Sequence, residues 1–237
     1  MKQVKTADGY AVLFPGGERR GELPAFLGDE ECALARRFMQ TVPGYCETPL
    51  VRLPALAREL GLSGIYVKDE STRFGLNAFK GLGGMMAVFR VVCGVLRLNP
   101  RSARFEDLRA PQYRACLENI TFVTATDGNH GRGVAWAANQ LGCASCIYMP
   151  VGSAPSRVEN IRRCGAREVI VTGLHYDDTV RLAAETAQER GWHLVQDTAF
   201  EGYETVPGWI AQGYTVLGEE ALAQLRRNPD IKVALLD

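Results

Sequence analysis

The second half of the chain alternates short apolar runs with longer amphipathic segments. The apolar runs have the length of strands, and the predicted strands span residues 120–125, 144–149, 168–172, 193–196 and 232–236. The amphipathic segments carry apolar residues at helical spacing, and the predicted helices span residues 131–141, 155–164, 178–190 and 207–226. Strands that alternate with helices form parallel β-α-β units. The pattern therefore predicts an α/β fold with open, mostly parallel sheets and helices on both faces.

The first half of the chain has a less regular pattern. Residues 1–27 are rich in Gly and Pro and predict an extended arm. The apolar run at 65–67 predicts a buried strand, and the polar stretch 101–119, which has few apolar anchors, predicts one or two short helices. Further helices are predicted at residues 29–40, 54–60 and 78–98.

Ligands in open α/β sheets bind at the carboxyl ends of the strands. The loops that follow the predicted strands span residues 70–79, 126–130, 150–155, 173–177 and 197–206. The glycines after Lys80 do not fit a dinucleotide-binding loop, because Met86 stands where the third glycine of that pattern belongs. The sequence also contains no phosphate loop, nucleophile elbow or zinc-protease motif.

A lysine follows the first of these loops. Asn77 is a favourable N-cap, so a helix is predicted to begin directly after it, with Lys80 in the first turn. The positive end of the helix dipole opposes a lysine there by roughly 0.3–1 kcal/mol. Gly81, Gly83 and Gly84 each cost a helix about 1 kcal/mol relative to Ala, which suggests that a ligand or another backbone approaches closely. On its own, Lys80 is more simply explained as a solvated surface charge.

The segment 126–131 joins a predicted strand to a predicted helix. Unpaired N–H groups at a helix N-terminus bind anions such as a carboxylate. Gly128 permits a tight turn, and Asn129 offers both a donor and an acceptor. A simpler explanation is that Asp127 or Asn129 caps the helix. Asp197, in a later loop, is equally compatible with an ordinary turn residue.

Composition excludes several classes of function. The 237 residues include 27 Lys and Arg and 27 Asp and Glu, so the formal net charge is zero. Without a basic cluster, nucleic acids and anionic membranes are poor partners, and no apolar run approaches the ~20 residues of a membrane span. Seven cysteines, an odd number, and no signal-peptide core predict reduced thiols in the cytoplasm. Cys143 and Cys146 lack a second pair or a nearby His, so no metal site is predicted.

Three stretches together resemble the pyridoxal-phosphate (PLP) enzymes of fold type II, which are the tryptophan synthase β type. The first runs from Lys68-Asp69-Glu70-Ser71 through Arg73-Phe74-Gly75-Leu76 to Ala78-Phe79-Lys80. The other two are Thr126-Asp127-Gly128-Asn129-His130-Gly131 and Gln196-Asp197-Thr198-Ala199. Within the fold type II group, these stretches look like the diaminopropionate ammonia-lyases.

The resemblance implies a role for each residue of the motifs. It implies that Lys80 binds PLP covalently, and that Phe79 and Asn129 contact the cofactor. It implies that two aspartates, Asp127 and Asp197, are catalytic and move protons. A third set is expected to contact the substrate carboxylate, namely Thr126, Gly128 and His130.

The resemblance also implies an activity and an organisation. The implied activity is elimination of ammonia from 2,3-diaminopropionate to give pyruvate, by a homodimer when full length. The implied domains are residues 1–84 of a large domain, a smaller α/β domain at 85–200, and a return into the large domain at 201–237. In such enzymes a strand like 231–236 leads into a glycine loop that cradles the PLP phosphate; no such loop follows, so we expect a chain truncated at its C-terminus. Two alternatives stay open: a serine or threonine dehydratase-like lyase, and an inactive chain that serves only as a binding or assembly module.

Overall fold

The computed structural model describes residues 2–5, 11–14 and 24–227. The predicted strand at 232–236 and most of the predicted arm lie outside these ranges. Near the N-terminus, β1 (Lys2–Lys5) and β2 (Ala11–Phe14) pair antiparallel. Part of the predicted arm is therefore a two-stranded sheet.

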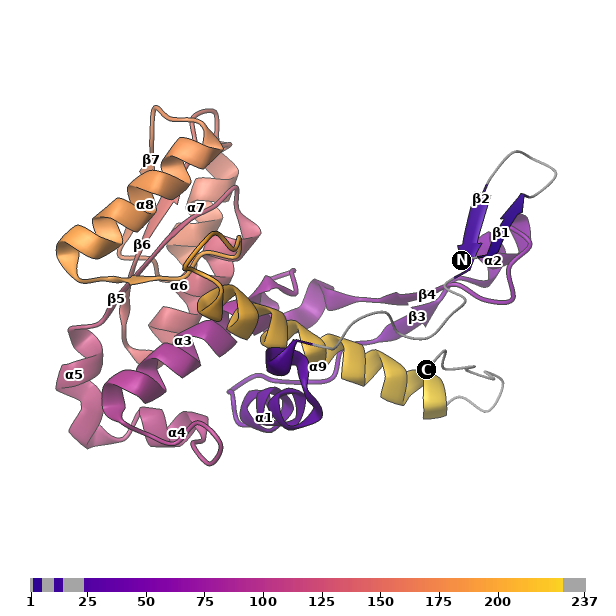
Figure 1. Ribbon diagram of the computed structural model, residues 1–237, viewed down its shortest axis with the longest axis horizontal. Helices are drawn as coiled ribbons and strands as arrows, with labels where there is room; N and C mark the ends of the chain where they lie inside the picture. The colour runs from indigo at the N-terminus through magenta and orange to yellow at the C-terminus, as the bar shows by residue number, and fades with distance from the viewer. Residues whose placement is uncertain (1, 6–10, 15–23, 228–237) are drawn as a thin grey trace.

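A four-stranded parallel sheet forms the core of the larger lobe (Figure 1). Its strands are β5 (Thr121–Ala125), β6 (Ala144–Met149), β7 (Glu168–Val171) and β8 (His193–Leu194). They lie in the order β7-β6-β5-β8, and every pairing is parallel. The predicted α/β fold with a parallel sheet is confirmed.

The helices predicted from amphipathic spacing are also present. They are α1 (Asp29–Met39), α2 (Pro54–Glu59), α3 (Lys80–Leu96), α6 (Asn129–Leu141), α7 (Pro155–Arg163), α8 (Tyr176–Arg190) and α9 (Thr205–Arg227). Shorter elements are η1 (Ala25–Leu27), η2 (Glu70–Gly75), α4 (Phe105–Leu108), η3 (Pro111–Tyr113) and α5 (Arg114–Glu118). None of the helices in the described ranges combines the length and the hydropathy needed to cross a bilayer.

Side chains of the sheet alternate between two hydrophobic clusters. Phe122 and Ile147 belong to the cluster that includes apolar residues of α6 and α7, whereas Val123 and Cys146 pack against α8. Successive residues of a strand point to opposite faces of the sheet. Helices therefore cover both faces, as the alternating pattern predicts.

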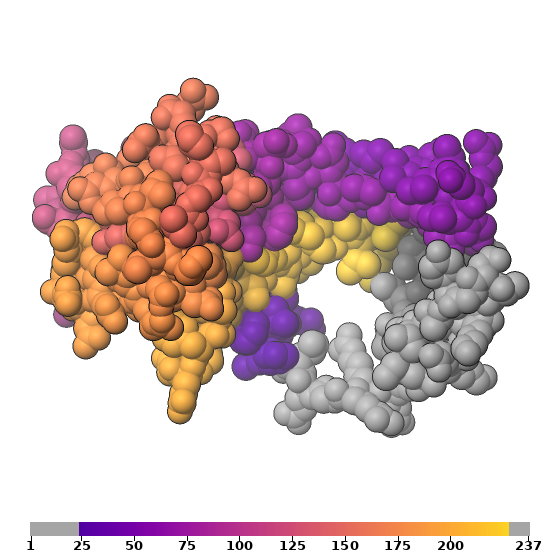
Figure 2. Space-filling view, turned by 90° about the horizontal axis from the view of Figure 1, so that it is seen from above, coloured from indigo at the N-terminus to yellow at the C-terminus, as the bar shows by residue number. Residues whose placement is uncertain are grey.

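The apolar run at 65–67 does not form a buried strand, so that prediction is wrong. β4 (Tyr66–Lys68) pairs antiparallel with β3 (Leu50–Arg52), and Val67 lies opposite Val51. Both valines are exposed, at 45% and 39%. The two strands lie in an arm that projects from the lobe (Figures 1 and 2), where both valines stay exposed although Lys68 of β4 contacts Glu220 and Gln224 of α9.

The helix that carries Lys80 begins later than predicted. Asn77 is not its N-cap but adopts a left-handed backbone conformation with φ of +52°, and α3 starts at Lys80 itself. The preceding residues fold into the 3-10 turn η2, which ends with Phe74 and Gly75 at φ of +51° and +71°. Asn and Gly tolerate positive φ better than other residues. The local turn therefore delays the helix and makes Lys80 its first residue.

Helix α3 packs closely between α6 and α9. A Cβ atom on Gly84 would lie 2.7 Å from the carbonyl carbon of Gly133 in α6. A Cβ atom on Gly213 in α9 would lie 2.5 Å from the carbonyl oxygen of Leu82. The expectation that another backbone approaches the glycines after Lys80 is confirmed for Gly84, whereas Gly81 and Gly83 face side chains. These contacts hold the first turns of α3 against α6 and α9.

Candidate active site

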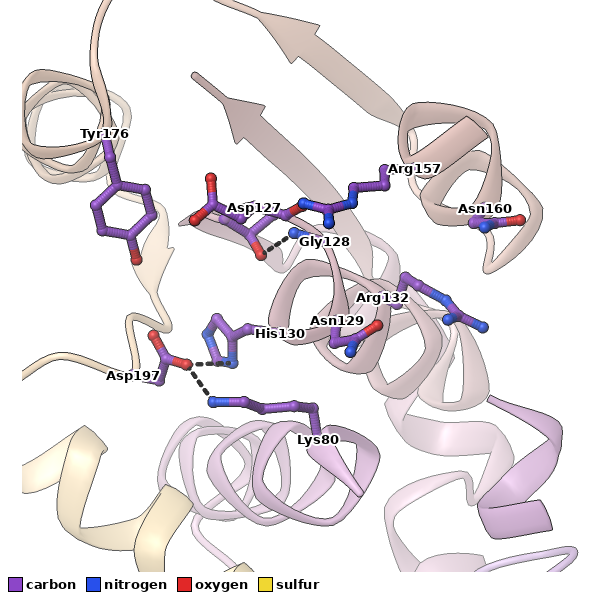
Figure 3. Close-up of a pocket in the computed structure, with 11 residues that line it drawn as sticks. Lys80, Asp127, Gly128, Asn129, His130, Arg132, Arg157, Asn160, Tyr176 and Asp197 are labelled. Atoms are coloured by element: carbon purple, nitrogen blue, oxygen red, sulfur yellow. Dashed lines mark hydrogen bonds and ion pairs between the residues drawn. The ribbon is translucent and has the colours of Figure 1, made fainter. Parts of the chain in front are cut away.

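A cavity of about 370 Å³ lies at the edge of the sheet where the strands end (Figure 3). Its lining comes from the N-terminus of α3 and from the segments that follow β5, β6, β7 and β8. The residues that line it are Lys80, Thr126, Asp127, Gly128, Asn129, His130, Arg132, Arg157, Asn160, Tyr176 and Asp197. The three residues predicted to be catalytic, which are far apart in the sequence, are thus brought to one cavity.

Lys80 and Asp197 form an ion pair inside this cavity. Nζ of Lys80 donates a hydrogen bond to Oδ2 of Asp197 at 2.8 Å, and the two side chains are 29% and 17% exposed. Nζ also lies 5.7 Å and 5.6 Å from the ring centres of Phe79 and Tyr214, within cation–π range. Burial alone would raise the pKa of Asp197, but the neighbouring His130 and Lys80 hold that pKa below its ordinary value. The cavity therefore contains an amine beside an ionised carboxylate.

His130 lies behind Asp197 and is almost completely buried. Its Nε2 atom lies 2.7 Å from the carbonyl oxygen of Val195, so Nε2 carries the hydrogen and donates it. Its Nδ1 atom has no hydrogen-bond partner and lies 3.7 Å from Oδ2 of Asp197. Burial lowers the pKa of His130, as does Lys80, while Asp197 and the Val195 carbonyl raise it. The imidazole is therefore neutral, with its lone pair on Nδ1.

The segment 126–131 is shaped by the hydroxyl of Thr126. Its Oγ1 atom accepts hydrogen bonds from the backbone N–H groups of Gly128 at 2.9 Å and Gly131 at 3.1 Å. The hydroxyl hydrogen is left to donate. In the part of the chain that the structure describes, no acceptor takes the backbone N–H groups of Asn129 and His130. The start of α6 thus offers the unpaired donors expected of an anion site.

Asp127 lies across the cavity from Lys80 (Figure 3). The side chains of Asp127 and Asn129 are both exposed. The backbone carbonyl oxygen of Asp127 accepts a hydrogen bond of 3.1 Å from Nη1 of Arg157. The pKa of the Tyr176 phenol is raised, mainly by burial and further by the negative charges of Asp197 and Asp127. The tyrosine hydroxyl therefore lies within electrostatic reach of both predicted catalytic carboxylates.

One predicted residue lies beside the cavity rather than in its lining. The ring of Phe79 is 39% exposed and packs edge-on against Tyr214, with ring centres 5.0 Å apart. Its predicted contact with the cofactor stays a prediction.

Sequence reasoning missed four lining residues, which are Arg132, Arg157, Asn160 and Tyr176. All four lie in helices that follow strands. Tyr176 falls inside the predicted loop 173–177 but was given no role. Arg132 and Arg157 lie two residues beyond the predicted loops 126–130 and 150–155, so extending those loops by about one helical turn of roughly four residues would have included them; Asn160 lies in the second turn of α7.

Comparison with known proteins agrees with this geometry. The family model described as "Pyridoxal-phosphate dependent enzyme" matches residues 42–235. Diaminopropionate ammonia-lyase from Escherichia coli (strain K12) is 52% identical over 206 residues, which are 87% of this chain and 50% of that protein. The protein of the same name from Salmonella typhimurium (strain LT2) is 53% identical over 188 residues, which are 79% of this chain and 46% of that protein. The chain spans about half the length of these curated relatives.

Solved structures show the same similarity. The crystal structure of the Escherichia coli diaminopropionate ammonia-lyase in apo form superposes with a TM-score of 0.81 at 50% identity. The match covers 87% of this chain and 55% of that one. Because the family model matches most of its length, the chain belongs to the pyridoxal-phosphate dependent enzymes.

Proposed function

We propose that this chain carries the lysine site of an enzyme that uses PLP to eliminate ammonia from 2,3-diaminopropionate, giving pyruvate and ammonia. One observation carries the proposal: the amine of Lys80 is paired with Asp197 inside a cavity that also contains Asp127. Two relatives that are called diaminopropionate ammonia-lyase support the choice of substrate.

The residues that line the cavity fit the cofactor of the family. Lys80 offers a primary amine, the group that bonds covalently to an aldehyde, and 370 Å³ falls within the roughly 300–1,000 Å³ of small-molecule sites. Nδ1 of His130 is a buried polar atom without a partner at the same place. Lys80 would hold PLP, and Phe79 and Asn129 would contact it. When bound, PLP draws electrons from the α-carbon of an amino acid and makes its proton acidic.

The two aspartates serve as proton acceptors on different sides of the substrate. Asp197 is ionised beside Lys80, so it can accept a proton from the α-carbon. Asp127 approaches from across the cavity, and can accept the proton of the opposite enantiomer. This division of labour rests on the family resemblance and on the positions of the two carboxylates.

The charges of the cavity favour a substrate with one acid and two amines. The unpaired N–H groups at the start of α6 bind the substrate carboxylate, in the turn formed by Thr126 and Gly128. The second amino group, which leaves as ammonia, is attracted by the carboxylate of Asp127. Serine and threonine carry a hydroxyl there and gain less from that charge. Asp127 therefore favours diaminopropionate over the dehydratase alternative.

We also infer the organisation of the whole protein from the resemblance. Residues 1–84 and 201–237 are assigned to a large domain and residues 85–200 to a smaller α/β domain. The full-length enzyme is assigned to a homodimer in the cytoplasm. The cysteines of the described ranges, which are all free thiols, are compatible with that compartment.

The test combines cofactor binding with product analysis. We expect PLP to develop a long-wavelength absorbance band with the wild-type chain and not with Lys80→Ala. We expect ammonia to be released faster from 2,3-diaminopropionate than from D-serine or L-serine. Equal ammonia release by the wild type and by Lys80→Ala would refute the proposal. Faster release from serine would favour the dehydratase alternative, and a band without release would favour a chain that only binds.

A further inference from the structure

We propose that His130 stores the proton that Asp197 takes from the substrate, so that the two residues act as a relay. This inference rests on the proposed function, because it concerns the reaction at Lys80. From the sequence, His130 could be a general base, but a supporting role with a contact to the substrate carboxylate is favoured, and no relay with Asp197 is predicted. The geometry around Nδ1 points to the new role.

The ring of His130 is fixed with its free lone pair facing Asp197. Its Nε2 atom donates to the carbonyl oxygen of Val195 at 2.7 Å, which holds the ring and fixes its tautomer. Nδ1 is buried and unpartnered, 3.7 Å from Oδ2 of Asp197. A buried nitrogen lone pair without a donor is costly. The same Oδ2 atom accepts from Lys80, so Oδ2 of Asp197 faces both the amine and the imidazole (Figure 3).

Two charged groups face the imidazole. Asp197, from the segment after β8, favours a protonated ring, while Lys80, from α3, disfavours it. Burial is the largest influence and lowers the pKa of His130, so the ring rests neutral and can accept a proton. Asp197 stays ionised at rest, because its Oδ2 atom accepts a hydrogen bond from the ammonium of Lys80 at 2.8 Å. A carboxylate next to a histidine is better suited to stabilise an imidazolium than to keep a proton itself.

The relay moves one proton from the substrate to His130 and back to the leaving group. The C–H bond of the α-carbon breaks, its electron pair stays on the substrate, and the proton forms an O–H bond with Oδ2 of Asp197. That proton then moves to the lone pair of Nδ1, which restores the carboxylate and leaves an imidazolium beside it. The departing nitrogen leaves with the electron pair of the C–N bond. It takes the proton back through Asp197 and becomes ammonia.

The separation of 3.7 Å is longer than the roughly 2.7–3.2 Å of a hydrogen bond. Catalytic hydrogen bonds often shorten only when substrate is bound. Oδ2 is held toward Lys80 at 2.8 Å in this structure. Once the amine of Lys80 is engaged elsewhere, a rotation of the Asp197 side chain can bring Oδ2 to Nδ1.

The first test does not need activity. Nitrogen NMR of the chain reports the tautomer and the pKa of each of its three histidines, and His175→Gln and His193→Gln identify the remaining signal. We expect His130 to carry its hydrogen on Nε2 at neutral pH. We expect its pKa to fall in Asp197→Asn, because Asp197 favours the charged ring. A hydrogen on Nδ1, or a His130 pKa that Asp197→Asn leaves unchanged, would overturn the relay.

The second test separates the relay from a structural role. In His130→Gln the side-chain amide reaches as far as Nε2 and keeps the bond to Val195, but it offers no basic nitrogen at Nδ1. We expect kcat to fall about 100-fold, with KM changed less than about threefold. The wild-type rate falls as acid protonates Nδ1, and we expect this acid limb to disappear in His130→Gln. The control is His193→Gln, which changes a partly buried histidine of β8 outside the cavity lining and should leave both values unchanged.

The two proposals fail in different ways. A kcat of His130→Gln within twofold of the wild type, with the same pH profile, would overturn the relay and leave the proposed function intact. No ammonia from 2,3-diaminopropionate with the wild type would refute the proposed function. In that case the tautomer and the pKa of His130 decide whether the Asp197–His130 pair exists.

Discussion

Residues 24–227 contain two lysines, and they differ in what surrounds their amines. Nζ of Lys68 lies 2.7 Å from Oε2 of Glu220, 2.6 Å from the carbonyl oxygen of Thr48 and 2.8 Å from Oε1 of Gln224. An ammonium has three N–H groups, so all of its donors are used. The side chain is only 9% exposed. Lys68 is therefore held in place and has no donor left to offer a ligand.

Lys80 is paired less completely. Among the described residues, its amine donates to Asp197 alone, and its side chain is 29% exposed to the cavity. Two N–H groups remain free for a ligand. Both lysines are paired with an acidic residue, so burial and an acidic partner do not distinguish a reactive lysine. What distinguishes Lys80 is that it lines a cavity and has hydrogen-bond donors left without a partner among the described residues.

Lys68 belongs to a buried charge cluster around Glu220. Arg73 in the same cluster has no solvent exposure, and its guanidinium donates to Glu220 at 2.7 Å, to Glu70 at 2.8 Å and to the carbonyl oxygen of Cys46 at 2.8 Å. Because Glu220 lies on α9 and Arg73 in η2, the cluster joins the turn before Lys80 to that helix. Saturated partners thus hold the scaffold, whereas the pair in the cavity stays available for chemistry.

The largest effect is expected from breaking the cluster. Replacing Arg73 by Met leaves Glu70 and Glu220 buried without their main partner, which typically costs about 3–5 kcal/mol. We expect Arg73→Met to lower the free energy of unfolding in urea by that amount. The matched change in the cavity, Lys80→Met, should cost under about 1 kcal/mol, because a partly exposed pair contributes little. Equal losses for the two variants would contradict the comparison.

A smaller effect is expected from acid. Burial would raise the pKa of Glu220, but Arg73, Lys68 and Tyr45 lower it from 4.5 to about 2. Because the folded pKa lies below the unfolded one, the carboxylate stabilises the protein above pH 4.5, and this contribution is lost as pH falls toward 2. The amount is on the order of 3 kcal/mol. We expect the stability of Glu220→Gln, measured by urea unfolding, to depend less on pH in this range than that of the wild type. Parallel plots of stability against pH for the two proteins would contradict this role of Glu220.

The close packing under Lys80 gives a third expectation. A Cβ atom on Gly133 would lie 2.7 Å from the backbone carbonyl oxygen of Lys80 itself. Gly133→Ala should therefore cost about 1–3 kcal/mol and weaken PLP binding. Gly94→Ala, at an exposed position of α3 with open space around it, should be neutral or stabilising by up to about 1 kcal/mol. Thermal unfolding measures the stability of both variants, and a PLP titration measures their cofactor binding. If Gly133→Ala changed neither stability nor PLP binding, α6 would be able to move away from Lys80.

The smallest effect is expected from an exposed ion pair. Arg114 and Glu118 lie one turn apart on α5, 3.0 Å from each other and both largely exposed. Glu118→Gln should change the free energy of unfolding by under about 0.5 kcal/mol. A larger loss of stability would mean that the burial of an ion pair does not determine how much the pair contributes to the free energy of unfolding.

The sequence predicted the elements well and the polar contacts poorly. Helices α6 to α9 and the four parallel strands follow from local periodicity, because each buries one face or both. The exposure of Val67 and the left-handed Asn77 could not be foreseen, since they depend on what covers an arm and on how η2 folds. Nothing local links Arg73 to Glu220, which are 147 positions apart. The motifs did bring Lys80, Asp127 and Asp197 to attention, but their placement around one cavity with His130 and Tyr176 required the fold.

One measurement tests the central claim directly. The wild-type chain is incubated with PLP and reduced with borohydride, which makes any amine–aldehyde bond permanent, and the modified lysine is located by mass spectrometry. We expect the modification on Lys80 and not on Lys68. Modification of Lys68 to the same extent, or an unmodified Lys80, would contradict the claim that an incompletely paired amine beside Asp197 is the cofactor site.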